Sequence, residues 1–429
     1  MKKIVVIGCG AAGMLAAIQL ARKGHSVTVL EKNEKAGKKL FITGKGRCNI
    51  TNNCDEETFL KNVVSNPKFL YSSIYNFNPE ATIAFFEELG LRLTTQRGNR
   101  VFPESEHSSD VIAALTKEMK RLGVEVWYNT CATELVYIQD LATDNDNYEK
   151  SLIKVKSVRY RQTDVKNSGE LEADCVVVAT GGMSYQATGS TGDGYSFAGE
   201  IGMKLVESRP ALVPLEIKEE LCKRLMGVSL KNVSVCFEAR VKGKTRKIYE
   251  DFGEMLFTHF GVSGPVILSA SSVIGKYMDN GIDMYIDFKP AITKEQLDAR
   301  ILRDFDASSN KQLRNAIAEL LPKSLLPEII AYAKLDMYKK VNEVSKEERL
   351  SLVDALKHFK LTVTGTRDFN EAIITQGGVA VSEINPQTMQ AKRTENLYFI
   401  GEVLDLDAYT GGYNLQIAWS TAMNVDIKE

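Results

Sequence analysis

Three glycines near the start of the chain have the spacing of a site for the phosphates of a dinucleotide. Gly8, Gly10 and Gly13 follow the apolar run at residues 4–7 directly, in the order G-x-G-x-x-G. The first glycine allows a sharp turn from strand to helix, the second leaves room for a pyrophosphate at the backbone, and the third lets the helix pack closely on the strand. The phosphates would then lie at the N-terminus of a helix expected over residues 11–23, where unpaired N–H groups and the helix dipole favour anions.

An acidic residue completes this unit. A second strand, expected over residues 26–30, ends at Glu31. A carboxylate at this point can accept hydrogen bonds from an adenosine ribose and disfavours a 2′-phosphate. Strand, glycines, helix, strand and acid together predict a dinucleotide-binding site; the alternative is a tight turn in an ordinary α/β domain.

A loop rich in glycine and cations comes next. It contains Gly44, Lys45, Gly46, Arg47 and Asn49. The backbone and guanidinium of such a loop can approach a phosphate or the edge of a flavin ring. Because the loop lies just past Glu31, cofactor contact is favoured over a solvated basic loop.

The C-terminal stretch is predicted to form a strand, a loop and a helix. The helix starts at about Tyr413, and the loop before it carries the following glycines and acids: Gly401, Glu402, Asp405, Asp407, Gly411 and Gly412. The strand would deliver an acid towards a ribityl-phosphate region, and the glycines would let the backbone meet a planar ring. The positive end of the helix dipole would then stabilise the negative charge of a reduced flavin.

Few side chains have the chemistry to move a proton, and no strong acid–base constellation is found. His259 lies in the glycine-rich stretch FTHFG, and Tyr413 lies at a helix start. For His259, the alternative is a buried histidine whose hydrogen bonds are all made within the protein. For Tyr413, the alternative is a contact through the backbone only.

The elements that must position these residues indicate an α/β fold with more than one domain, because 429 residues exceed one typical core. Buried-strand patterns at residues 4–7, 26–30 and 176–179 indicate a parallel sheet, interrupted by a β-meander over residues 132–171. Short alternating runs over residues 211–288 indicate a small β-barrel or sandwich, and residues 293–358 are predicted to be helical. Residues 374–389 are predicted to form a turn followed by a hairpin.

The bulk composition is typical of a globular enzyme. The net charge is −1, which argues against a nucleic-acid or strongly anionic membrane partner. No signal peptide or membrane span is expected. The seven cysteines form no C-x-x-C pair, which favours a reducing cytoplasmic location and argues against a metal site.

Several motifs together resemble one family, the bacterial FAD-dependent NAD(P)/FAD oxidoreductases that include aminoacetone oxidase-like flavoproteins and 3-dehydro-bile-acid Δ4,6-reductase. The motifs include GCGAAG, TGKGRCNITN, ATGG, LFTHFGVSGPVIL and GEVLDLDAYTGGYNLQIAWSTA. The resemblance implies a Rossmann-like FAD-binding domain of the two-dinucleotide-binding type, built from residues 1–205 and 361–429. It also implies an inserted β-barrel at residues 206–292 and an inserted helical domain at residues 293–360.

The same resemblance implies which residues would contact FAD. The ADP half would be held by Gly8, Gly10, Ala11, Ala12, Gly13, Glu31 and Lys32, with the backbone of Ala132 near the adenine. The run from pyrophosphate to flavin would be lined by Lys39, Gly44, Gly46, Arg47, Cys48 and Asn49. The ribityl chain and ring would be surrounded by Gly182, Gly401, Glu402, Gly412, Tyr413, Asn414 and Gln416. Lys45 stands where a glycine or small residue is more usual in the family.

These observations predict an FAD-dependent oxidoreductase that reduces a conjugated alkene of a small molecule at the expense of NADH or NADPH. An amine oxidase that produces hydrogen peroxide is the alternative among enzymes. A flavin-containing RNA-modification protein and a redox-silent binding protein are alternatives from other classes, although no basic surface interleaved with aromatic residues is apparent. The substrate, the preferred pyridine nucleotide and the oligomeric state do not follow from the sequence.

Overall fold

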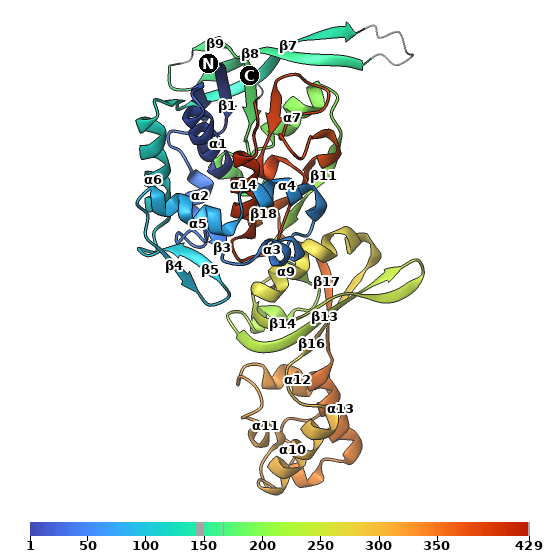
Figure 1. The fold of residues 1–429 in the computed structure, drawn as a ribbon. Coiled ribbons are helices and arrows are strands. Elements are labelled where there is room, and N and C mark those ends of the chain that lie inside the picture. The colour runs from blue at the N-terminus through green and yellow to red at the C-terminus, as the bar shows by residue number, and fades with distance from the viewer. Residues whose placement is uncertain (143–149, 166, 428–429) are drawn as a thin grey trace. The chain divides into compact units, whose positions relative to one another are not determined.

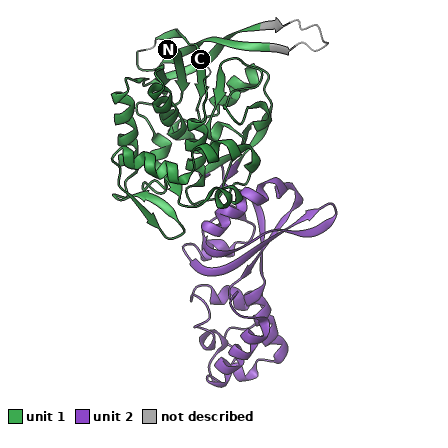
Figure 2. Ribbon diagram, viewed as in Figure 1, with its two compact units in different colours: residues 1–209, 373–429 green, residues 210–372 purple. Residues whose placement is uncertain are grey.

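The computed structural model describes residues 1–142, 150–165 and 167–427. It divides into two compact units, of which the first joins residues 1–209 to residues 373–429 and the second comprises residues 210–372 (Figure 2). Both ends of the chain therefore build one unit, and the second unit is an insertion into it. The observed boundaries lie later in the chain than the expected ones at residues 205 and 360.

A parallel five-stranded sheet in the order β19-β10-β1-β2-β6 lies at the centre of the first unit (Figure 1). Its strands are β1 (Lys3–Ile7), β2 (Ser26–Leu30), β6 (Glu125–Trp127), β10 (Cys175–Val178) and β19 (Leu397–Phe399). β1 pairs with β2 on one side and with β10 on the other. The strand order thus reverses between β1 and β10, and doubly wound sheets bind ligands at the carboxyl ends of such a strand pair.

Helices of the first unit pack around this sheet. They are α1 (Ala11–Arg22), α2 (Lys38–Ile42), α3 (Glu56–Lys61), α4 (Tyr71–Asn76), α5 (Pro79–Glu88), α6 (Ser108–Arg121), α7 (Asp193–Glu200) and α14 (Tyr413–Met423). α1 is buried along most of its length because it packs against β1, β2, α6 and α14. Its one buried polar side chain is Gln19, whose Nε2 donates to the carbonyl oxygen of Val425 at 2.8 Å, just past the end of α14.

Two smaller antiparallel sheets belong to the same unit. One has the order β3-β5-β4, with β3 (Thr51–Asn52), β4 (Leu93–Gln96) and β5 (Arg100–Pro103). The other is the expected meander, β7 (Thr130–Ala142), β8 (Lys150–Gln162) and β9 (Ser168–Glu172). The chain between β7 and β8 lies outside the described residues.

A closed barrel forms the centre of the second unit, in the order β12-β15-β14-β13-β16-β17. Its strands are β12 (Leu215–Ile217), β13 (Ser229–Val241), β14 (Lys244–Phe257), β15 (Gly261–Ser263), β16 (Ile282–Asp287) and β17 (Phe359–Thr366). The last strand follows the inserted helices, which explains why the second unit extends beyond residue 360.

The helices of the second unit are α8 (Leu221–Arg224), α9 (Pro265–Ile274), α10 (Lys294–Asp306), α11 (Leu313–Ala316), α12 (Leu326–Tyr332) and α13 (Lys346–Lys357). α10 and α13 each begin with a capping box, formed by Thr293 with Gln296 and by Ser345 with Glu348. Reciprocal caps of this kind satisfy N–H groups that have no partner within the helix.

The segment that begins at residue 374 differs from the expected turn. β18 (Ile374–Val379) is a strand that pairs with β11 (Leu205–Ala211). A Cβ atom on Gly377, where φ is +92°, would lie 2.3 Å from the carbonyl oxygen of Glu207. The glycine therefore permits a close approach of two backbones inside a strand, and the prediction of a turn was wrong because glycine serves both purposes.

Candidate functional site

In the turn between β1 and α1, close packing requires glycine at positions 8 and 13 but not at position 10. A Cβ atom on Gly8 would lie 2.6 Å from the carbonyl oxygen of Ala179, and one on Gly13 would lie 1.9 Å from the carbonyl oxygen of Gly8. Gly10 has φ −82°, which any residue adopts, and a Cβ atom there would meet nothing within 4 Å. Neither the backbone nor the packing requires glycine at position 10, and the open space beside it leaves room for a pyrophosphate against the backbone.

The N-termini of α1 and α14 are open to an anion. Gly10 and Gly412 are their N-cap residues, neither helix has a side-chain cap, and neither has an acidic residue in its first turn. The first N–H groups of each helix therefore have no partner within the helix and no neutralising carboxylate. Ala11 and Ala12 lie in the first turn of α1, and a Cβ atom on Gly401 would lie 2.9 Å from Cβ of Ala12.

Glu31 is held in one orientation by the backbone around it. Its side chain is 7% exposed. One carboxylate oxygen accepts from the N–H of Cys9 at 2.9 Å, and the other accepts from the N–H and the Nδ2 of Asn33 at 2.8 and 2.7 Å. The N–H of Thr130 donates to the Glu31 carbonyl oxygen at 2.8 Å, which brings the start of β7 and thus Ala132 near this acid.

Lys32 lies beside Glu31 in sequence but is engaged elsewhere. Its Nζ donates to Asp193 at 2.7 Å and to Thr191 at 2.5 Å. Asp193 is the acid in the first turn of α7. The ion pair therefore neutralises both side chains, and a contact of Lys32 with a cofactor would have to share this ammonium group.

A cluster of polar groups joins the carboxyl end of β10 to the loop after β19. Nζ of Lys39 lies 2.6 and 2.7 Å from the two carboxylate oxygens of Glu402 and 2.5 Å from Oγ of Ser184. The N–H of Thr375 donates to the same carboxylate at 2.9 Å. A Cβ atom on Gly182 would lie 2.5 Å from Oγ1 of Thr375. The structure thus brings together Lys39, Gly182 and Glu402, which the sequence analysis assigned to different motifs.

The loop 44–49 and the strand after it are fixed to α14. Oγ1 of Thr51 donates to Gln416 at 2.6 Å, and the indole N–H of Trp419 donates to the carbonyl oxygen of Ile50 at 3.0 Å. A Cβ atom on Gly412 would lie 2.5 Å from the carbonyl oxygen of Thr51. Segments more than 350 residues apart in the chain are therefore locked side by side.

The side-chain amides of α14 serve this packing. Nε2 of Gln416 donates to the carbonyl oxygen of Phe77 and to Ser420, at 3.0 and 2.9 Å. The amide of Asn414 accepts from the N–H of Ala408 and donates to its carbonyl oxygen, at 2.9 and 2.8 Å. Both amides hold the loop and the helix in place, so a contact of these two residues with a cofactor would be made chiefly by the backbone.

Loop 44–49 has an unusual backbone. Gly44, Lys45, Gly46 and Cys48 all have positive φ, of 63°, 60°, 84° and 57°. The left-handed conformation costs an L-residue free energy, and Lys45 adopts it where a glycine would not pay this cost. Burial raises the pKa of the Cys48 thiol, which disfavours its thiolate form.

Several buried side-chain polar atoms in these segments have no hydrogen-bond partner within geometric limits. Within the described residues, four such atoms are Arg47 Nε, Asn49 Oδ1, Thr180 Oγ1 and Tyr195 OH. A fifth, Ser73 Oγ, lies in α4. Buried side-chain polar atoms normally have a hydrogen-bond partner. The position of the first four, in the GRCN, ATGG and TGDGY segments, fits a bound group rich in hydrogen-bonding atoms.

One nitrogen of the Arg47 guanidinium is held by side chains. Its NH2 group donates to Gln96 and Glu106, each at 2.6 Å, and the guanidinium lies 4.4 Å from the ring centroid of Phe102. β4, β5 and Glu106 therefore orient Arg47 through NH2 and the face of the guanidinium, and Nε is the buried nitrogen that remains for a ligand.

A buried carboxylic acid lies in the loop before α14. Asp407 is fully buried, and Nε2 of Gln376 donates to its two oxygens at 3.2 and 3.1 Å. Burial, reinforced by the nearby carboxylate of Asp405, raises the pKa of Asp407 to about 6. Asp405 in turn accepts from Nδ2 of Asn66 at 2.9 Å. A buried carboxyl whose pKa approaches neutrality can hold and release a proton.

The two predicted proton-transfer residues lie in different units. Tyr413 is 8% exposed, its ring centroid lies 5.8 Å from that of Phe59, and burial raises its pKa to about 12. His259 lies between β14 and β15 in the second unit and is exposed, with the ring of Phe260 at 4.9 Å. The alternative of a satisfied buried histidine is therefore wrong for His259.

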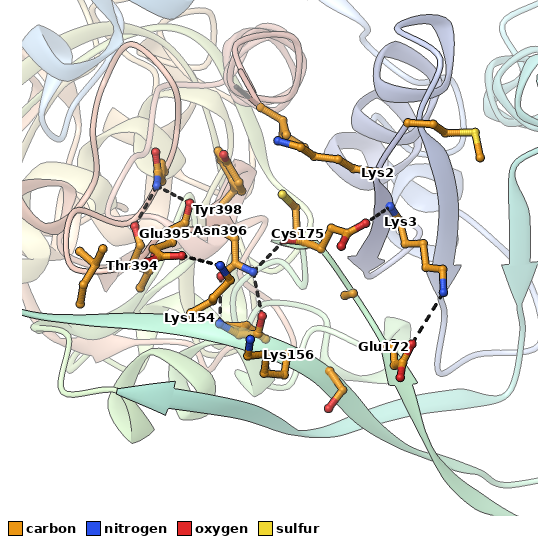
Figure 3. A pocket seen from close by; sticks show the side chains of 18 of the residues that line it. Lys2, Lys3, Lys154, Lys156, Glu172, Cys175, Thr394, Glu395, Asn396 and Tyr398 are labelled. Carbon is orange, nitrogen blue, oxygen red and sulfur yellow. Dashed lines mark hydrogen bonds and ion pairs between the residues drawn. The ribbon is translucent and has the colours of Figure 1, made fainter. Parts of the chain in front are cut away.

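A cavity of about 1100 Å³ lies at the amino ends of β1, β10 and β19, at the opposite edge of the sheet (Figure 3). Its cations and acids pair with one another, as in Lys3 with Glu172 at 3.7 Å and Lys154 with Glu395 at 2.9 Å. Asn396 is satisfied by the backbone of Val155. Among the described residues that line this hollow, no buried side-chain polar atom is without a partner, and the carboxyl ends of the strands are the better site.

Sequence reasoning noted Asp407 without giving it a role, and it missed Tyr195, Thr180 and Thr375. Their signal was weak, because a hydroxyl beside a glycine is common in any turn. The TGDGY and ATGG segments were visible only as glycine clusters. Nothing in the sequence indicates that the hydroxyls of Thr180 and Tyr195 are buried without a partner. Nor does it indicate that the hydroxyl of Thr375 accepts from the N–H groups of Met183 and Ser184.

The described residues limit two other kinds of site. Among residues 1–142, 150–165 and 167–427, no helix combines the length and apolar character that crossing a membrane requires. The same part of the chain contains no group of three or more His, Cys, Asp or Glu side chains placed to hold a metal ion.

Comparison with known proteins agrees with this geometry. The family model of the HI0933-like protein Rossmann domain matches residues 2–426. The chain is 30% identical over 427 residues to a 3-dehydro-bile acid delta(4,6)-reductase of Clostridium scindens, covering 98% of this chain and 97% of that one. It is also 30% identical over 420 residues to a ribosomal RNA dihydrouridine synthase of Haemophilus influenzae, covering 97% and 96%.

Among solved structures, the 3-ketosteroid delta1-dehydrogenase of Sterolibacterium denitrificans shares the fold with a TM-score of 0.51 at 15% identity, over 99% of this chain and 98% of that one. Both full-length relatives are named as enzymes, and the family model extends over nearly the whole chain. The chain therefore belongs to the HI0933-like Rossmann-domain family and is an FAD-dependent oxidoreductase.

Proposed function

We propose that the protein reduces a carbon–carbon double bond conjugated to a carbonyl group, with NADH or NADPH as the electron donor. The observation that carries the proposal is the pair of full-length relatives at 30% identity. One is named a delta(4,6)-reductase and the other a dihydrouridine synthase, and both names describe the addition of hydrogen to an unsaturated ring. The chemistry common to both names is the simplest chemistry to assign to this chain.

The residues for FAD in this proposal are those that surround the open helix N-termini and the unpartnered polar atoms. The first turn of α1 and Glu31 would hold the ADP half, and loop 44–49 with the start of α14 would hold the flavin half. Bound FAD supplies a hydride to the substrate once it is reduced. The remaining work of the protein is to orient the substrate and to move one proton.

Asp407, Tyr413 and His259 are the proposed proton-transfer residues. Asp407 holds a proton on its buried carboxyl group through part of the neutral range, since its pKa is about 6. Tyr413 stays protonated at neutral pH, since its pKa is about 12, and it can donate from its phenol oxygen. His259 is exposed on the second unit and is the weakest of the three.

The test is an anaerobic visible spectrum of the purified holoenzyme before and after NADH or NADPH, followed by an α,β-unsaturated ketone. The proposal requires the flavin absorbance to bleach with the nucleotide and to return when the ketone is added. A flavin that no pyridine nucleotide reduces contradicts the reductase assignment and favours a redox-silent binding protein. If amines bleach it instead and air restores it with formation of hydrogen peroxide, the protein is an amine oxidase.

A further inference from the structure

The tip of the β13–β14 hairpin is the most cationic stretch of the second unit. Residues 239–249 contain Arg240, Lys242, Lys244, Arg246 and Lys247 and no acid. Lys247 forms an ion pair with Glu250 at 2.5 Å. The other four cations are exposed and have no ion pair among the described residues. We call residues 240–246 the basic hairpin.

The basic hairpin extends beyond the barrel. β16 pairs with β13 only as far as Ala239, which lies opposite Ile282. Past this point the strands pair only with each other, through Arg240 with Thr245 and Val241 with Lys244. The two-residue turn has Lys242 at φ 51° and Gly243 at φ 76°, as in a tight hairpin. In Figure 1, the two strands of this hairpin continue past the barrel and end in a projecting tip.

The charge of the basic hairpin contrasts with that of the rest of the second unit. Elsewhere many cations are paired, such as Arg349 with Asp298 at 2.6 Å and Lys357 with Asp287 at 2.7 Å. Like charges close together on a hairpin repel one another and destabilise it. Exposed cations without an ion pair also occur in the helical part of the unit, but there they are dispersed along the chain. Four within the seven residues of the basic hairpin repel one another, and an anionic partner would relieve this repulsion.

An exposed aromatic side chain lies on the same ribbon. Phe252 of β14 is 58% exposed and pairs with Ser234. Ser234 alternates with Val233 and Val235, which are buried in the barrel, so Phe252 lies on the outer face. Phe252 lies six residues along β14 from Arg246, which is on the order of 20 Å at about 3.3 Å per residue. A single strand of several nucleotides spans this length, so that a base stacks on the phenyl ring while phosphates nearer the tip meet the cations.

We propose that the basic hairpin binds the phosphate backbone of a single-stranded stretch of RNA, with Phe252 stacking on a base. An anionic membrane fits less well, because the turn residues Lys242, Gly243, Lys244 and Thr245 offer no large apolar side chain to insert. The charge balance of the whole chain hid this surface, since a net charge of −1 is an average over 429 residues. The proposal deepens the proposed function, on which it rests for the identity of the reducible group, because a pyrimidine base carries a double bond conjugated to a carbonyl.

The test is the affinity of the full-length holoenzyme for a short, labelled, uridine-containing single-stranded RNA, measured by fluorescence anisotropy over a range of salt concentrations. Four phosphate contacts predict a slope of log K against log salt that falls by about 3 when the cations are removed, at about 0.7 per contact. The variant is R240Q/K242Q/K244Q/R246Q. The matched control is K311Q/K323Q/K340Q/K346Q, which removes the same charge from exposed positions in the helical part of the same unit.

The proposal expects the hairpin variant to lose most of its RNA affinity and its salt slope, and the control to keep both. Phe252→Ala should weaken binding about tenfold without changing the slope, because stacking releases no counterions. Absence of RNA binding by the wild type, or an equal loss in both quadruple variants, overturns the proposal. Hairpin-dependent binding to phosphatidylserine vesicles without RNA binding overturns it in favour of a membrane.

The proposed function is tested separately in the same preparations. Reoxidation of the reduced flavin by a small α,β-unsaturated ketone should be the same in the wild type and in the hairpin variant, because that substrate needs no phosphate contact. If the ketone fails with both proteins while RNA binds through the hairpin, the proposed function fails and the binding surface stands. If the ketone reacts and RNA does not bind, the outcome is the reverse.

Discussion

The substitution Asp407→Asn measures by how much an ionised, buried carboxylate lowers the free energy of unfolding. The pKa of Asp407 is raised from 3.8 to about 6 by burial and by Asp405, and each unit corresponds to about 1.4 kcal/mol. The folded state therefore binds the proton more tightly than the unfolded state. Stability is highest below pH 4 and falls as pH rises towards 6, and above that the ionised carboxylate costs about 3 kcal/mol. Asparagine does not titrate, so the variant should lack this loss.

The assay is urea unfolding of the protein without cofactor, followed by tryptophan fluorescence. Both tryptophans, Trp127 and Trp419, lie in the first unit with Asp407. Between pH 4.5 and pH 7.5 the free energy of unfolding of the variant should improve by about 2 kcal/mol relative to the wild type. Asp426→Asn, at a side chain that is 60% exposed, should show no such change. A difference between wild type and Asp407→Asn that stays constant with pH would refute the reasoning.

Five other substitutions, in three experiments, probe the FAD site. Gly10→Val should change the free energy of unfolding of the apo-protein by no more than about 1 kcal/mol. The same variant should lose FAD binding, which is measured by flavin retention on desalting. Gly13→Ala should fail to fold, because its Cβ would lie 1.9 Å from a carbonyl oxygen. If both variants bind FAD, the pyrophosphate does not lie at this turn. Glu31→Gln replaces one carboxylate oxygen by an NH2 group, which cannot accept from the three N–H donors that the carboxylate binds. The variant should be destabilised by about 1 to 3 kcal/mol in urea, whereas an unchanged midpoint would contradict the observed orientation. In a double-mutant cycle with Lys39→Met and Glu402→Gln, urea unfolding should give a coupling of about 1 to 2 kcal/mol, since this ion pair is about 22% exposed; additive effects would show that the pair contributes nothing.

The sequence analysis correctly predicted those parts of the fold in which the residue type at each position has a single physical explanation. The glycines of the first turn, the acid at Glu31 and the apolar strands beside them follow from local sterics and burial, and the structure has them as expected. The resemblance predicted an FAD-binding fold with an inserted barrel, and the family match and the strand order agree with it.

Residues with two possible reasons were predicted less well. Gly377 and Gly378 were assigned to a turn, but they lie in a strand where another backbone approaches closely. The sequence analysis did not predict the basic hairpin with Arg240 and Lys242, because the net charge of the whole chain does not show where unpaired cations lie. The unusual protonation of Asp407 depends on burial by segments distant in sequence, which no local pattern reveals.

The most direct test of the proposed function is the reaction of the reduced enzyme with its acceptor. The holoenzyme is reduced with dithionite without air, freed of excess reductant and mixed with an α,β-unsaturated ketone while the flavin spectrum is recorded. The account predicts that the oxidised spectrum returns and that the saturated ketone forms in an amount equal to the flavin. A flavin that stays reduced with unsaturated ketones, yet reoxidises at once in air, would contradict it.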